Sequence, residues 1–324
     1  MTRRSTYRPA SARAGAALLA LSYAATALSA PDRLEGQVTT DDGVRLHYTE
    51  SGTGAQVVVI PLGFYLEPYL LEHLARRHRV IMYDPRNRGR SQAAPLSTIS
   101  LDRQLRDLEN LRESLRLDRF ALIGWSGMGM EMAAYAIRHP ERVSRLIQIS
   151  PVPPAAAIMR DAGDARAVRI DPAAQAALDA RQKAGEFSAD PARYCRLDNE
   201  ISMPSNFADA SLARNVVDVC IHDNEHPVNL WPYFGALLSS FGDYDLREPL
   251  RRLETPRLVI HGREDGIPLA GARAWTAGYG PSRLLVVSPA GHFPFIERRA
   301  VVLAAIDEFL DGRWPAASTE GVEP

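Results

Sequence analysis

The chain has 324 residues, of which 46% are hydrophobic and 24% charged, an ordinary composition for one large globular domain or two small ones. Its formal net charge is −1, and only 7% of its residues are aromatic. We therefore expect neither a strongly basic face nor an aromatic platform for stacked bases, which excludes nucleic acid from the expected partners.

The N-terminus has the layout of a secretory signal peptide. Residues 1–13 hold four arginines and no acidic residue, and residues 14–30 are apolar and uncharged. This layout predicts a signal peptide at 1–29, cleaved after Ser29 or alternatively after Ala30, with export by a Sec or twin-arginine route. We expect a periplasmic or secreted protein without stable membrane insertion. The alternative is a membrane anchor at 14–30, a stretch at the short limit for a span.

Behind this segment, short apolar runs alternate with helical patterns. Strands are expected at residues 44–52, 55–63, 79–86, 119–126, 144–150, 256–262 and 282–288. Helices are expected at residues 67–78, 101–115 and 127–139, from about 269, and at about 295–311. The alternation predicts an α/β protein with a mostly parallel central sheet flanked by helices.

The alternation stops between residues 152 and 250, which are polar, helical in pattern and without a convincing strand. We expect a helical cap at 152–250, and a loose tail at 313–324. The two cysteines, Cys195 and Cys220, lie in the cap and match no metal motif. A disulfide in an exported protein and two free thiols in a retained one are both open alternatives.

Ser126 stands at a glycine-rich corner between an apolar strand and a helix. A sharp turn of this kind exposes a nucleophile, and small neighbours such as Gly124 and Gly129 let the strand and the helix approach each other. The backbone N–H of Gly127, at the helix start, would face a developing oxyanion. Because a hydroxyl alone is a weak nucleophile, a base and an orienting acid are also required.

Two later strands supply these groups in the loops that follow them. Asp265 follows the strand at 256–262, and His292 follows the strand at 282–288. The order Ser, Asp, His is the one that this arrangement requires. In such a triad Ser126 attacks a carbonyl, the histidine transfers the proton, and the aspartate holds the histidine tautomer.

With these residues in place, the chain resembles the α/β-hydrolase superfamily from about residue 40 to 311. The resemblance rests on the motifs IPLGF, YDPRNRGRS, GWSGMG, HGRED and AGHFPF. It implies the α/β-hydrolase fold, with a core at 30–151 and 251–312 around the helical cap, and a mechanism that needs no cofactor and no metal. It also implies a second oxyanion donor, the backbone N–H of Phe64.

Three positions depart from the family's usual pattern. Met128 occupies the fifth place of the G-x-S-x-G motif, which is usually small, and Leu62 replaces the usual histidine before the oxyanion-loop glycine. Asn87 stands where the family often has glycine, and asparagine tolerates the left-handed conformation that such a turn needs. We expect the elbow to persist and the oxyanion loop to be braced differently.

The remaining polar candidates are interpreted as structural. His222 and His226 have no third ligand beside them, so they predict no metal site. Asp243 and Asp245 are alternative acids, although cap-to-core contacts are the interpretation we favour. The other structural candidates are His261, Arg86, Arg88 and Arg90.

Substrate recognition is expected from the cap and the loops beside the triad. Residues 220–246 resemble cap segments of prolyl-iminopeptidase-like members of the superfamily, whose carboxylates bind a free α-amino group. By that resemblance Glu225 would bind an ammonium, whereas a capped helix start is the alternative that we favour. Further candidates for substrate contact are Trp125, Trp231 and Phe293.

Three functions follow from these residues. The first is a serine hydrolase that cleaves a carboxylic ester, lactone or amide of a small molecule. The second is an exported aminopeptidase of the prolyl-iminopeptidase type, acting on a short peptide. The third is a non-catalytic, ligand-binding member of the same fold, which an intact triad disfavours.

Overall fold

The computed structural model describes residues 33–163, 165–222, 230–278 and 280–320. The expected signal peptide and its alternative, a membrane anchor, lie outside these residues. Within the described ranges, no helix has both the length and the apolar character needed to cross a membrane.

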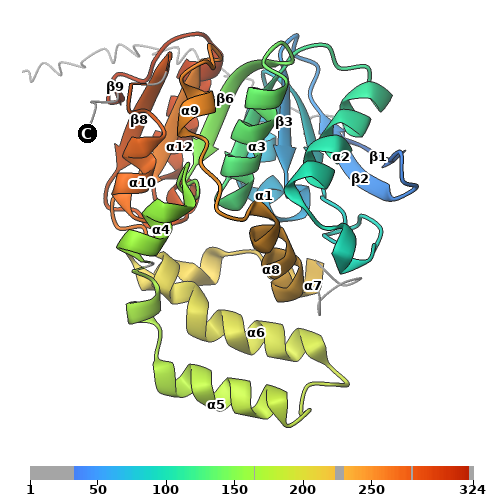
Figure 1. Ribbon diagram of the computed structural model, residues 1–324, viewed down its shortest axis with the longest axis vertical. Helices are drawn as coiled ribbons and strands as arrows, with labels where there is room; N and C mark the ends of the chain where they lie inside the picture. The colour runs from blue at the N-terminus through green and yellow to red at the C-terminus, as the bar shows by residue number, and fades with distance from the viewer. Residues whose placement is uncertain (1–32, 164, 223–229, 279, 321–324) are drawn as a thin grey trace, which may run out of the picture. The chain divides into compact units, whose positions relative to one another are not determined.

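The described strands form one sheet in the order β1-β2-β4-β3-β5-β6-β7-β8-β9 (Figure 1). Neighbours from β4 to β8 pair in parallel, whereas β1, β2 and β9 pair antiparallel with their neighbours. The expected mostly parallel sheet is therefore confirmed. The bounds are β1 Arg33–Thr39, β2 Arg45–Ser51, β3 Val57–Pro61, β4 Arg79–Tyr83, β5 Phe120–Trp125, β6 Val143–Ile149, β7 Arg257–Gly262, β8 Ser282–Val287 and β9 Thr319–Glu320.

Helices cover both faces of this sheet, with α2 packed beside α3 and α1 beside α12. The amphipathic pattern explains α2, because Leu105, Leu108 and Leu111 form its buried stripe and the Ser100 side chain caps its first turn. The bounds are α1 Gly63–Ala75, η1 Leu96–Thr98, α2 Leu101–Ser114, α3 Gly127–Arg138, α10 Leu269–Ala274, α11 Pro294–Glu297 and α12 Arg299–Leu310.

Helix α1 begins four residues earlier than the sequence pattern predicts. It starts at Gly63, directly after β3, and Leu62 before it adopts the left-handed conformation with φ 58° and ψ 46°. Pro68 therefore lies inside the helix. Proline is most frequent in the first helical turn, which is why the pattern places the start too late. The early start brings the first turn of α1 close to the end of β3.

The described residues between β6 and β7 form a helical insertion, which we call the cap (residues 152–250). Figure 1 shows α5 and α6 at its far end, with α4 and α8 between them and the sheet. A single antiparallel bridge joins its two ends, between Ala155 and Asp245. The bounds are α4 Ala156–Ala162, η2 Ala167–Arg169, α5 Pro172–Lys183, α6 Pro191–Ser202, η3 Met203–Asn206, η4 Ala210–Asn215, α7 Val219–His222, α8 Leu230–Phe241 and α9 Arg247–Leu250.

A disulfide resolves the question that the sequence left open about the two cysteines. Cys195 in α6 and Cys220 in α7 are bonded, with their Cα atoms 5.9 Å apart. The Asn199 side-chain amide lies 3.3 Å from the Cys220 sulfur. The bond therefore fixes α6 to α7 inside the cap.

The prediction of a loose tail at 313–324 is wrong for its described part. Strand β9 pairs with β8, and the Trp314 ring packs on Phe309 with centroids 5.0 Å apart. The Arg283 guanidinium also lies over the Trp314 ring, 5.3 Å from its centroid. The tail is attached because one aromatic side chain and two paired residues bind it to the last strand and helix of the core. Residues 321–324 lie outside the described part.

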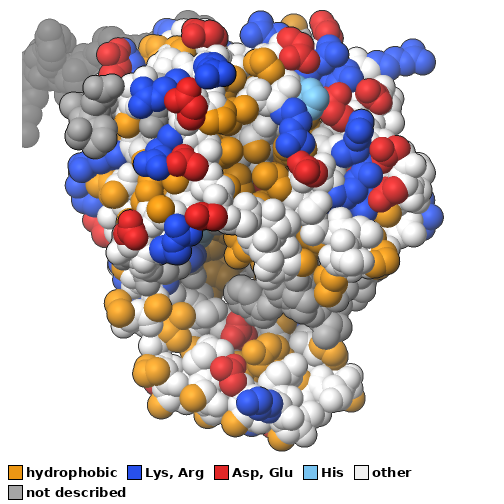
Figure 2. Space-filling model, in the orientation of Figure 1, with side chains coloured by type: hydrophobic (Ala, Val, Ile, Leu, Met, Phe, Trp, Pro, Cys, Tyr) orange, Lys and Arg blue, Asp and Glu red, His pale blue; other side chains and the backbone are white. Residues whose placement is uncertain are grey.

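The surface is of mixed charge. Figure 2 shows acidic and basic side chains interspersed over the core, with hydrophobic side chains between them. This mixture agrees with the net charge of −1 and gives the face in view no large field of one sign.

Candidate active site

Ser126 occupies a strained corner between β5 and α3. Its φ of 55° and ψ of −125° are rare for a residue with a side chain, and it is the N-cap of α3. A Cβ atom at Gly124 would lie 2.5 Å from the carbonyl oxygen of Met128, and one at Gly129 would lie 3.0 Å from the side chain of Pro151. Both glycines are therefore required by close backbone packing. Met128 fits the fifth place of the motif because its own side chain is buried in the core.

The structure brings the three predicted triad residues together. His292 Nε2 lies 3.0 Å from Ser126 Oγ, and His292 Nδ1 lies 2.9 Å from one Asp265 oxygen and 3.1 Å from the other. Asp265 also accepts the backbone N–H of Ile267 at 2.9 Å. Asp265 and His292 are both buried, whereas Ser126 is partly exposed. A hydroxyl that solvent can reach is thus backed by a buried imidazole and carboxylate.

The electrostatics of Asp265 favour its charged form. Burial by itself would raise the pKa of this carboxyl, but the charge and the hydrogen bond of His292 outweigh burial and lower the pKa to about 2. The carboxylate is therefore ionised near neutral pH and can hold the imidazole N–H that faces it.

Trp125 and Phe293, two of the expected substrate contacts, flank His292. The Trp125 indole N–H donates to the His292 carbonyl at 2.9 Å, and its ring lies 5.1 Å from the imidazole centroid. Phe293 is only 2% exposed and stacks on Phe207 of the cap at 4.9 Å. The expectation of substrate contact is therefore wrong for Phe293, because packing against the cap and Trp125 covers it. Trp125 remains partly exposed.

The two expected oxyanion donors differ in their surroundings. A Cβ atom at Gly127 would meet nothing within 4 Å, so the start of α3 faces open space. The Phe64 N–H instead donates to Asp84 Oδ1 at 2.9 Å. Phe64 as a free oxyanion donor is therefore a wrong expectation for this structure. The reason is the early start of α1, which directs the N–H toward the turn after β4, where Asp84 also accepts the Arg90 N–H at 2.9 Å.

The arginines of this turn have structural contacts, as expected. Arg86 is fully buried and pairs with Asp107 at 2.6 Å and with Asp42 at 2.9 Å. The Arg88 guanidinium lies over the ring of Phe64 at 5.0 Å, and it also lies over two rings of α8. Asn87 has a φ of 63°, which confirms its left-handed conformation. The turn thus joins the first helix of the core to the cap.

The alternative acids lie elsewhere. Asp243 pairs with Arg160 at 2.6 Å, and Asp245 pairs with Arg247, so each has an exposed partner within the cap. The buried His261 is held structurally, because its Nε2 lies 3.0 Å from the Ile267 carbonyl oxygen. Asp265 is therefore the acid that contacts His292.

Several cap residues of interest lie outside the described part of the structure. Glu225 and His226 belong to the segment that is not described, and the side chains of His222 and Trp231 are likewise not described. Among the residues that are described, no group of three or more His, Cys, Asp or Glu side chains could hold a metal ion.

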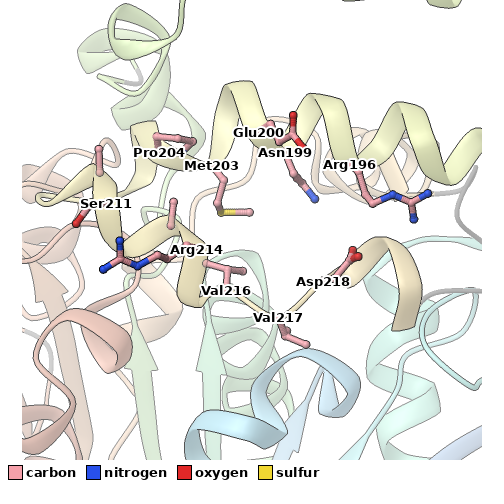
Figure 3. A pocket seen from close by; sticks show the side chains of 12 residues that line it. Arg196, Asn199, Glu200, Met203, Pro204, Ser211, Arg214, Val216, Val217 and Asp218 are labelled. Atoms are coloured by element: carbon pink, nitrogen blue, oxygen red, sulfur yellow. The ribbon is translucent and has the colours of Figure 1, made fainter.

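The cap contains a cavity of about 460 Å³ between α6 and the segment from η4 to α7 (Figure 3). Met203 points across it toward Val216, and Val217 lies on the same side as Val216. Arg196 and Arg214 lie at opposite ends. The described residues that line this space include none of the triad, so the cavity belongs to the cap itself.

Comparisons with known proteins point to one family. A family model described as the alpha/beta hydrolase fold matches residues 57–299. A non-heme chloroperoxidase from Streptomyces lividans is 28% identical over 253 residues, which cover 73% of this chain and 85% of that protein. A pimeloyl-[acyl-carrier protein] methyl ester esterase from Legionella pneumophila (strain Corby) is 27% identical over 203 residues, 62% of this chain and 74% of its own.

Solved structures show the same architecture. A bromoperoxidase from Bacillus anthracis superposes with a TM-score of 0.67 at 21% identity, over 86% of this chain and all of the other. At this identity the likeness shows the fold alone.

Proposed function

Because the chain belongs to the alpha/beta hydrolase fold family, we propose that it is a serine hydrolase that cleaves a carboxylic ester, lactone or amide through an acyl-enzyme. One observation carries the proposal: Ser126 Oγ, His292 Nε2 and His292 Nδ1 form an unbroken hydrogen-bonded line to Asp265. A binding protein without catalysis has no need of such a line at a strained, partly exposed serine.

The steps follow from the positions of these groups. His292 accepts the hydroxyl proton as Ser126 attacks the carbonyl carbon, and Asp265 stabilises the imidazolium that forms. The imidazolium then donates its proton to the leaving group. The leaving group departs, and the acyl group remains bound to Ser126. A water molecule, activated by the same imidazole, releases the acid and restores Ser126.

The elbow supplies a donor for the tetrahedral intermediate. The Gly127 N–H stands at the N-terminus of α3, where the helix dipole favours negative charge. The space that a Cβ atom at Gly127 would occupy is open, so no described side chain covers the helix start on that side. We assign the first oxyanion contact to this N–H.

Among substrates, the proposal places esters before aminoacyl amides. The aminopeptidase alternative depends on Glu225, which lies outside the described residues. A curated relative is named as a methyl ester esterase, and the triad chemistry requires only an acyl group with a leaving group. A small-molecule ester is therefore the substrate class that we propose.

Two experiments test the proposal. A fluorophosphonate probe should label Ser126, and the label should disappear in Ser126→Ala. A folded protein that never reacts with the probe is not a serine hydrolase. Hydrolysis of p-nitrophenyl acetate should exceed that of a proline p-nitroanilide, and the reverse order would favour the aminopeptidase.

Export is a further part of the proposal. The disulfide between Cys195 and Cys220 supports it, because disulfides persist in oxidising compartments. N-terminal sequencing of the protein recovered from the periplasm or medium should begin at Ala30. Recovery of the full-length chain in the cytoplasm, with both thiols free, would contradict export.

A further inference from the structure

Glu297, the last residue of α11, connects two segments that are far apart in the sequence. Its Oε1 accepts the backbone N–H groups of Ala208 at 2.8 Å and Asp209 at 3.3 Å, both in the cap. Its Oε2 accepts the backbone N–H of Gly291, in the loop that carries the histidine. One half-buried carboxylate thus joins the cap to the residue directly before His292.

The same two segments also contact each other directly. The His292 N–H donates to the Asn206 carbonyl oxygen at 2.7 Å, and the rings of Phe207 and Phe293 stack at 4.9 Å and 3°. A Cβ atom at Gly291 would lie 2.2 Å from the Asn206 carbonyl oxygen, so this approach requires glycine. The histidine backbone is therefore held by the cap on one side, while Trp125 holds its carbonyl on the other.

We propose that Glu297 is a positioning residue, which ties the cap segment 206–209 to the histidine loop and so sets His292 for proton transfer from Ser126. The inference rests on the proposed serine-hydrolase function. Nothing in the sequence motif identifies this role, because the partners of Glu297 are backbone N–H groups of a distant helical segment.

A carboxylate is the side-chain group that suits this position. It only accepts hydrogen bonds, and its two oxygens can serve three N–H donors at once. Glutamine has the same length and shape, but an NH₂ group, which donates hydrogen bonds and does not accept them, replaces one oxygen. In Glu297→Gln the side-chain NH₂ group therefore faces a backbone N–H, so one hydrogen bond is replaced by two donors that repel each other. The substitution opens no cavity.

The test compares Glu297→Gln with the wild-type full chain. Misplacement of a catalytic group by a fraction of an ångström to 1 Å costs up to about 100-fold in rate, so we expect kcat to fall about 10- to 100-fold. The rate of fluorophosphonate labelling should fall in parallel, since it requires the same histidine. KM for a p-nitrophenyl ester should stay nearly constant. Active-site titration counts the reactive enzyme, so a mere loss of folded protein would leave kcat per active site at the wild-type value.

Two matched variants serve as controls. Glu308→Gln makes the same change on α12, where the described residues show no hydrogen bond to the side chain, and should keep wild-type rates. Glu264→Gln acts on the same histidine loop, because Glu264 accepts the Ala290 N–H at 2.8 Å, but among the described residues this carboxylate has no hydrogen bond to the cap. Its effect should be smaller than that of Glu297→Gln. An equal effect would mean that loop support alone matters, and would overturn the coupling to the cap.

The failures of the two proposals can be told apart. If wild type never labels, the serine-hydrolase proposal is wrong. If wild type labels and folded Glu297→Gln labels equally fast, the positioning role is wrong. Should Glu297→Gln not fold, Phe207→Leu loosens the neighbouring aromatic contact between the same two segments, from the cap side. That variant should also label more slowly with unchanged KM, and wild-type rates there would overturn the inference.

Discussion

The serine and the histidine reach the same site by different physical means. The serine side, residues 124–129, is fixed by local geometry: a strained backbone at Ser126 and two glycines packed against neighbouring backbone and a proline. The histidine side, residues 288–293, is fixed by segments that are distant in the sequence. Asn206 and Trp125 bind the His292 backbone, and Glu297 links this loop to the cap segment 208–209. A turn therefore suffices to place a nucleophile, whereas its base depends on the rest of the fold.

The most severe test of this comparison removes the reactive side chain on each side. Ser126→Ala and His292→Ala should each lower kcat by about a million-fold, because the two groups act as a unit. Thermal unfolding should change little in Ser126→Ala, whereas His292→Ala leaves the buried Asp265 without its partner and should unfold at a moderately lower temperature. A large loss of melting temperature in both would mean that the two side chains serve stability, and the catalytic assignment would fail.

A buried acid in α3, the helix that follows the serine, predicts a loss of stability at alkaline pH. Burial raises the pKa of Glu131 in α3 to about 8, and the charge of Asp107 adds to the rise. The folded state thus holds a proton that the unfolded chain releases near its ordinary value of 4.5. The stabilisation is fully present below that value and is lost as pH rises through about 8.

The free energy of unfolding should therefore fall by up to about 4 kcal/mol between pH 5 and pH 9 from this group alone. Glu131→Gln stays neutral at every pH and should remove most of that fall in urea unfolding. An identical pH slope in wild type and variant would show that Glu131 does not titrate in this range.

Two glycines close to the serine test how far local geometry fixes its position. Gly124→Ala places a Cβ atom 2.5 Å from a backbone carbonyl oxygen and should lower the free energy of unfolding by about 3 kcal/mol. Gly127 directly follows the serine, and a Cβ atom there meets open space. Gly127→Ala should therefore change the free energy of unfolding by less than about 1 kcal/mol. Urea unfolding measures both. Equal losses would contradict the tight packing inferred at Gly124.

The histidine side should lose stability at the opposite end of the pH range, by a smaller amount. The pKa of Asp265 is lowered to about 2, so its contribution is present above the ordinary value of 3.8 and is lost as pH falls through about 2. We expect about 2 kcal/mol from this carboxylate. Asp265→Asn should flatten the acid limb of the unfolding free energy between pH 5 and pH 2. An unchanged limb would indicate that other carboxylates dominate it.

The sequence predicts the positions of the triad because strand patterns are strong here. Asp265 and His292 each follow an apolar strand, and the carboxyl ends of parallel strands meet at one edge of a sheet. Strand β1 escapes such reasoning, since most of its side chains are exposed and show no alternation. The register of β9 escapes it because two residues carry no pattern.

Contacts between distant backbone groups are the part that no local pattern reports. The Phe64 N–H goes to Asp84 because α1 starts immediately after β3, a consequence of chain geometry rather than of composition. Glu297 finds Ala208 and Asp209 only because the cap folds back onto the core. The pairing of the cysteines was likewise open, since a spacing in sequence does not give a Cα separation.

The bridge between Ala155 and Asp245 has a consequence for how this protein can be taken apart. The first and last residues of the cap include backbone segments that are already hydrogen-bonded to each other, so a short turn could join them without shifting any strand. Such a shortened chain would retain the strained backbone around its nucleophile, yet it would lack the Asn206 carbonyl oxygen that accepts the backbone N–H of His292. It would be a starting point for chains in which a different cap supplies this hydrogen bond.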